Sequence, residues 1–73
     1  MTLQNALIGS TYIVNSIDLD LAVARRLEAL GLTKGTDIVI LNRNRSGSVI
    51  IKVRGSRLAL GKNIASLIQM RGD

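Results

Sequence analysis

Residues 26–32 read RLEALGL, and this stretch decides how the chain turns between its helix and the strands that follow. Glycine is the one residue type that adopts a left-handed backbone without steric cost, so the presence of Gly31 predicts that the helix ends at Leu30. With Gly31 in that role, Leu32 and Leu27 are the pair that makes the hydrophobic contact of a Schellman motif. The stretch therefore predicts where the helix ends.

Upstream of this stretch, apolar residues recur at the spacing of a helix. They fall at i, i+4, i+8 and i+11 and form one stripe: Leu19, Val23, Leu27 and Leu30. Asp18 or Asp20 is placed to cap or charge the first turn, because a carboxylate accepts hydrogen bonds from the free N–H groups there. Arg25 and Glu28 are three residues apart on the outer face. The sequence thus predicts one amphipathic helix.

Five short strand-like runs surround this helix. In chain order they span residues 11–17, 37–42, 49–54, 57–60 and 67–70. In the first run Tyr12 and Val14 share one face. The second run is apolar on both faces, which indicates a central strand. One short helical turn is expected at residues 61–65, ahead of the last strand.

Glycine marks the turns, because the chain has no proline. Residues 33–36 are expected to form a turn and residues 43–48 a polar, basic loop. Gly55-Ser56 suits a two-residue type II′ hairpin, which takes glycine at its first position. Residues 1–9 read as a lead-in turn with three residues able to pack: Leu3, Ala6 and Leu7.

These elements predict a mainly β protein with one inserted helix, folded as a small SH3-like five-stranded barrel in a single domain over residues 1–73. Curling a sheet with one covered face into a barrel removes its exposed edges. The expected core comes largely from the strands after the helix and includes Val49, Ile51, Val53, Leu58 and Leu60.

The composition argues against an enzyme. The chain has 73 residues and contains no Cys and no His, so thiol chemistry and the usual general base are both missing. The serines therefore have no imidazole to activate them. The sequence has neither GxxxxGK[ST] nor GxGxxG, the glycine-rich motifs that hold phosphates. We expect no catalytic residue and no cofactor.

A metal site and a membrane span are also not expected. Asp18, Asp20 and Glu28 offer oxygen ligands but lack the spacing of an EF-hand loop, and the softer ligands are only Met1 and Met70. No run of eighteen apolar residues is present, and the N-terminus lacks the pattern of a signal peptide. The expected location is the cytoplasm.

The net charge of +5 suggests an acidic partner. Most of the cations come after the helix in the sequence: Arg43, Arg45, Lys52, Arg54, Arg57 and Lys62. Small basic barrels can bind nucleic acid through such a face. Proteins that read single strands usually stack bases on exposed aromatic side chains, however, and Tyr12 is the only aromatic residue here. We therefore rank nucleic acid below protein docking.

The motifs together resemble those of the FeoA proteins (ferrous iron transport protein A). RLEALGL at 26–32, Lys34-Gly35 and DIVIL at 37–41 are similar to the family's RL-x-x-LGL-x-x-G signature. The second half resembles I-x-V-x-G-x-R-(L/I)-A-L…IA…I, through VIIKVR at 49–54, Gly55, RLAL at 57–60, Ile64-Ala65 and Ile68. The opening resembles L…G…Y-x-V, through Leu3, Gly9, Tyr12 and Val14.

The resemblance implies a small cytoplasmic SH3-like domain that accompanies FeoB, a membrane transporter of ferrous iron with a cytoplasmic GTPase domain. The implied role is to dock on that part of FeoB, at the inner face of the membrane, and to regulate uptake. A similar domain ends the iron-dependent repressors of the diphtheria-toxin-repressor family, on whose account the family is often described as metal-binding. A repressor fragment is therefore an alternative interpretation.

Four cations are the candidate partner-binding residues: Arg25, Arg54, Arg57 and Lys62. They would meet an acidic patch on the partner. A third hypothesis makes Arg43 or Arg45, in the predicted loop, an arginine finger for the partner's GTPase. An exposed apolar residue such as Ile50 also offers a surface for weak self-association.

Overall fold

The helix and strands form largely where the apolar spacing predicts them. The computed structural model describes residues 1–72. Its elements are η1 (Leu3–Asn5), β1 (Thr11–Ile17), α1 (Leu21–Ala29), β2 (Asp37–Arg43), β3 (Val49–Val53), β4 (Ser56–Leu60), α2 (Lys62–Ala65) and β5 (Ile68–Gly72). The predicted strand bounds are correct for β1 and shift by one or two residues elsewhere.

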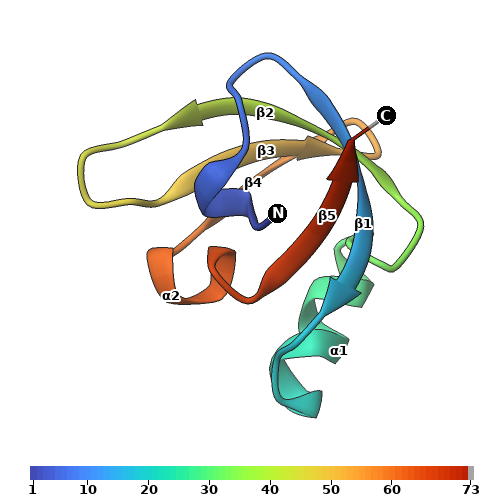
Figure 1. Ribbon diagram of the computed structural model, residues 1–73. Helices are drawn as coiled ribbons and strands as arrows, with labels where there is room; N and C mark the ends of the chain where they lie inside the picture. Colours follow the sequence, from blue (N-terminus) through green and yellow to red (C-terminus); the bar gives the residue numbers. More distant parts are fainter. Residues whose placement is uncertain (73) are drawn as a thin grey trace.

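The five strands form one antiparallel sheet in the order β4-β3-β2-β1-β5, so β2 is the central strand, as its apolar faces predict. Figure 1 shows the sheet curling so that η1 and α2 lie at the opening between β4 and β5, while α1 projects beyond the end of β1. Register shifts between Val14 and Ser16 and between Ile40 and Asn42 mark bulges, which increase the local bend of a strand.

The end of α1 has the predicted Schellman geometry. Gly31 has a φ of +97°, and its N–H donates to the Glu28 carbonyl at 2.9 Å. The Leu32 N–H donates to the Leu27 carbonyl at 2.9 Å, and both leucines are buried. At the other end of the helix, the Asp20 carboxylate accepts from the Val23 N–H at 3.0 Å, so Asp20 rather than Asp18 is the cap.

The core is aliphatic apart from Tyr12, and no polar side chain of residues 1–72 is buried within it. Val49, Ile51, Val53 and Leu60 are buried as predicted, whereas Leu58 is only partly buried at its margin. Three further predictions were wrong or overstated. Leu7 and Leu30 are 68% and 50% exposed instead of packed, and Ile50 is partly covered instead of exposed.

The hairpin between β3 and β4 differs from the predicted one. Val53 pairs with Ser56, so the two turn residues are Arg54 and Gly55, not Gly55 and Ser56. Both turn residues have positive φ, at +50° and +81°. This is the pattern of a type I′ turn, which matches the twist of a hairpin but seldom has arginine at its first position.

The N-terminal segment is held against the sheet by polar side chains. Nη2 of Arg43 donates to the carbonyls of Leu3 at 3.2 Å and Ala6 at 2.6 Å. The Gln4 amide donates to the Gly47 carbonyl at 2.8 Å, and the Tyr12 hydroxyl accepts from the Leu7 N–H at 2.9 Å. These bonds position η1, whose Leu3 is buried in the core.

Replacing Gly31 by Ala should destabilise the protein more than replacing Gly35 by Ala. Both positions have a left-handed φ, which costs an L-residue about 1–2 kcal/mol. A Cβ at Gly31 would also lie 2.9 Å from Cδ of Arg54, whereas a Cβ at Gly35 has nothing within 4 Å. Urea denaturation separates the cost of backbone strain from the cost of the clash with Arg54. It compares Gly31→Ala with Gly35→Ala in the wild-type background. It then measures the effect of Gly31→Ala in a protein that already carries Arg54→Ala. Equal losses at Gly31 and Gly35 would contradict a steric contribution from Arg54.

Replacing Arg43 by Met should lower the free energy of unfolding by about 1–3 kcal/mol, because two carbonyls lose their donor. Met preserves the aliphatic stem of Arg43. Arg45→Met is the matched control, since Arg45 is exposed in the loop between β2 and β3 and should change stability by less than about 0.5 kcal/mol. Equal effects of the two substitutions on the urea midpoint would show that the Arg43 bonds do not stabilise the fold.

Candidate functional site

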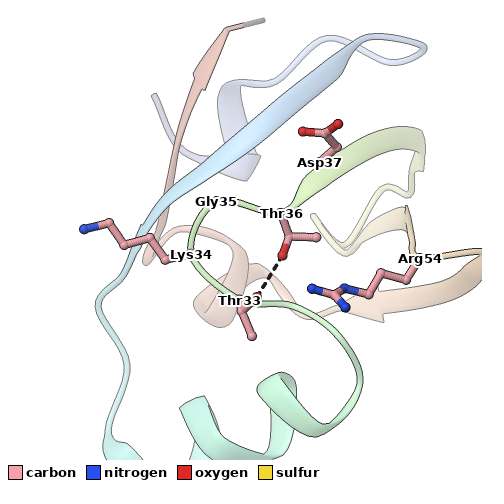
Figure 2. A pocket seen from close by; sticks show the side chains of 6 residues that line it. All are labelled: Thr33, Lys34, Gly35, Thr36, Asp37 and Arg54. Carbon is pink, nitrogen blue, oxygen red and sulfur yellow. Dashed lines mark hydrogen bonds between the residues drawn. The ribbon is translucent and has the colours of Figure 1, made fainter.

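An open depression of about 470 Å³ lies beside the turn that follows α1, lined by Thr33, Lys34, Gly35, Thr36, Asp37 and Arg54. The turn is closed by the Thr36 N–H, which donates to the Thr33 carbonyl at 3.1 Å, and the two threonine hydroxyls are 2.8 Å apart. Figure 2 shows the Arg54 guanidinium pointing toward these hydroxyls, while the charged ends of Lys34 and Asp37 point away from them. The arrangement offers a guanidinium and hydroxyl groups to an anionic group.

Arg54 lines this depression from an unusual backbone conformation. Its φ of +50° is a left-handed conformation that few non-glycine residues adopt. Its side-chain stem lies over Gly31, where the absence of a Cβ leaves room for it. Sequence reasoning selected Arg54 for its charge but missed both this contact and the threonine turn opposite, since the motif Thr33-Lys34-Gly35-Thr36 indicated only a turn.

Arg57 lies on the outer face of the same hairpin. It pairs directly with Lys52 across β3 and β4, and both side chains are exposed. No carboxylate residue occurs from position 38 to 72, and Asp37, just before this stretch, lines the depression together with Arg54. Two like charges placed directly opposite each other are unfavourable in a sheet. A negatively charged partner would relieve that repulsion.

The four candidate cations do not form one cluster. Arg54 and Arg57 belong to the turn end of the β3–β4 hairpin. Lys62 begins α2 at the other end, with its stem within 3.1–3.2 Å of where a Cβ on Gly47 would lie. A five-residue strand such as β4 is about 17 Å long, which separates the two ends. Arg25 is exposed on α1, a separate element from the hairpin and from α2.

The arginine-finger hypothesis needs a correction at Arg43. This residue was expected in a polar loop, but it is the last residue of β2, and its guanidinium is bound to the carbonyls of Leu3 and Ala6. It is therefore a structural residue. Arg45 is exposed in the loop after β2 and is the remaining candidate.

Three further observations concern the other candidate residues and elements. Tyr12 is 5% exposed, so the single aromatic ring is in the core and offers no platform for bases. Residues 1–72 contain no group of three or more acidic side chains arranged to hold a metal ion; Asp18, Asp20 and Glu28 do not form one. Among the helices described, none has the length and apolar character needed to cross a membrane.

Comparisons with known proteins agree with the motifs. The family model of the FeoA domain matches residues 1–71. Over 62 residues the chain is 34% identical to a protein of Methanocaldococcus jannaschii named as an Fe(2+) transport protein A, covering 85% of this chain and 74% of that protein. The solution structure of FeoA from Chlorobium tepidum superposes with a TM-score of 0.89 at 29% identity, covering 97% of this chain and 69% of that one.

Two further structures bear on the fold and on the alternative interpretation. The zinc-complexed FeoA of Stenotrophomonas maltophilia, described as a prokaryotic SH3 domain protein, gives a TM-score of 0.80 at 29% identity and covers 97% of this chain and 89% of that one. A manganese-dependent transcriptional repressor gives 0.83 at 23% identity, with 93% of this chain and 39% of that one covered, which shows a shared fold alone. The predicted SH3-like fold is confirmed, and the chain belongs to the FeoA family of ferrous iron transport accessory proteins.

Proposed function

We propose that this protein docks on the cytoplasmic, GTPase-bearing part of a FeoB transporter, at the inner face of the membrane, and thereby regulates ferrous iron uptake without catalysis of its own. Membership of a ferrous iron transport family supports the transporter as partner. The protein's contribution is a barrel that presents a charged surface. Docking of this kind depends on complementary charge and shape and needs no reacting group.

The observation that carries this proposal is the cationic end of the β3–β4 hairpin. Arg54 is directed into the threonine-lined depression, and Arg57 stands beside Lys52 on the adjoining outer face. An acidic patch on the transporter would engage both cations at once. We place Arg54 and Arg57 at the centre of the docking surface, with Arg25 at its margin. Lys62 lies at the other end of the hairpin, beside the loop that contains Arg45, and is left out of the surface.

Binding to nucleic acid is the second candidate, and the charge of +5 is the observation that favours it. The buried ring of Tyr12 removes the stacking platform that such binding usually uses. A basic face without aromatic side chains would bind DNA or RNA through phosphates alone, with an affinity that falls steeply as salt rises.

Charge reversal at the hairpin should weaken binding to FeoB. We expect Arg54→Glu and Arg57→Glu each to raise the dissociation constant about tenfold, because each places a carboxylate against an acidic surface. Arg45→Glu makes the same change of charge in the loop at the opposite end of the hairpin and should alter affinity less than about twofold. Titration calorimetry with FeoB in nanodiscs, at low and physiological salt, measures all three.

Two results would count against docking through this surface. One is the absence of any complex between the wild-type protein and FeoB at micromolar concentration and low salt. The other is an equal loss of affinity in all three variants, which would indicate a general effect of net charge. Binding of single-stranded DNA in a parallel titration, with no binding of FeoB, would favour the second candidate.

A further inference from the structure

The two edge strands of the sheet differ in how much of their outer backbone is covered. Along β5, the outer edge is partly covered by the N-terminus: Thr2 forms a bridge with Gln69, and the Met70 N–H donates to the Met1 carbonyl at 2.7 Å. Strand β4 forms the other edge and pairs only with β3 among residues 1–72. Four of the five β4 positions are partly or fully exposed. One edge of the barrel is thus left open.

The register shows which backbone groups of β4 are free. Opposite residues in an antiparallel pair alternate between exchanging hydrogen bonds and exchanging none, and the pair that flanks a two-residue turn exchanges them. Val53 and Ser56 flank the turn, so Ser56, Leu58 and Leu60 bond to β3. The N–H and C=O groups of Arg57 and Ala59 then point away from β3, and no loop or cap within residues 1–72 bonds to them.

The charges around this edge select what can pair with it. Arg54 and Lys62 flank β4, Arg57 lies within it, and Lys52 stands beside Arg57. A second copy of the protein paired edge to edge would bring two such sets of cations together, which is unfavourable. An extended strand that carries Asp or Glu would place its carboxylates beside Arg57 and Lys52.

The two faces of β4 indicate the pattern of that strand. Side chains alternate between the faces of a sheet, so a residue beside Arg57 lies on the outer, cationic face and a residue beside Leu58 lies on the core side. Leu58 is packed against the core but only partly buried, which leaves apolar surface for a neighbour to cover. An acidic residue followed by an aliphatic one satisfies both faces.

We propose that β4 accepts, as a sixth strand of the sheet, an extended segment of the FeoB partner in which acidic and aliphatic residues alternate. This inference rests on the proposed function and specifies the mode of docking. Backbone hydrogen bonds to Arg57 and Ala59 supply affinity, and the cations and Leu58 select the sequence. Arg54 lies next to this edge, so its depression can receive an acidic side chain from the same segment.

Substitution at Ala59 tests the backbone bonds. Ala59→Pro removes the outward N–H without removing a bond of the β3–β4 ladder, and proline is tolerated on edge strands. Ala59→Val, which keeps the N–H, is the matched control. We expect Ala59→Pro to weaken FeoB binding about tenfold and Ala59→Val to leave it within about twofold. Circular dichroism and urea denaturation establish that both variants fold.

Hydrogen exchange on the wild-type protein supplies a second measurement that needs no variant. In the free protein, the amides of Arg57 and Ala59 should exchange rapidly, whereas those of Leu58 and Leu60 are protected by β3. FeoB should slow exchange at Arg57 and Ala59 about tenfold or more. The four amides alternate along one strand, so Leu58 and Leu60 serve as internal controls.

The outcomes separate this inference from the proposed function. If FeoB binds, but Arg57 and Ala59 stay unprotected and Ala59→Pro binds like the wild type, the sixth-strand inference is wrong while docking stands. If FeoB does not bind at all, the proposed function fails and this mode of docking fails with it. If the two amides become protected merely on raising the protein concentration, the occupant is a second copy and the acidic segment is refuted.

Discussion

The backbone of Gly31 is the constraint on which the geometry of this barrel depends. Its left-handed conformation ends α1 and directs the chain toward β2, and the two bonds around it satisfy carbonyls that the helix would otherwise leave free. The missing Cβ also gives space to the stem of Arg54 from the distant β3–β4 turn. One glycine therefore satisfies a local requirement and a tertiary one, and it brings the helix end, the threonine turn and the hairpin together at a single place.

The local part of this arrangement could be predicted from sequence. A cap at Asp18 or Asp20, the helix end at Gly31 and the strand at residues 11–17 follow from spacing and from the conformational preferences of single residues, and the structure selects Asp20. The type of the β3–β4 turn could not be predicted in the same way. The expected turn has Gly55 first, which avoids an arginine with positive φ. In the structure Arg54 has that positive φ, and its side chain packs against Gly31, 23 positions earlier in the chain, a contact that local sequence does not reveal.

The candidate site was predictable to a similar extent. Its cationic character follows from the sequence, since no carboxylate occurs between positions 38 and 72. The grouping of the cations does not, because it depends on the pairing register. The register sets Arg57 beside Lys52 and puts Lys62 at the far end of the hairpin. Arg43 is the clearest failure of local reasoning: a polar, basic context indicated a loop residue, yet its guanidinium holds η1 against the sheet.

The cations beside the open β4 edge have a more specific role than attraction to any acidic surface, because they determine which strands can pair with that edge. A small barrel with an uncovered strand risks pairing with its own copies, and natural proteins commonly guard such edges with cationic side chains. Arg57 and Lys52 provide that guard, while Met1 and Thr2 cover the opposite edge with backbone. Positive charges at the edge do not prevent pairing with every strand. They repel the cations of a second copy but attract a strand with acidic side chains. Repulsion between these cations therefore disfavours pairing with a second copy, and the same cations favour the acidic strand of the proposed docking mode.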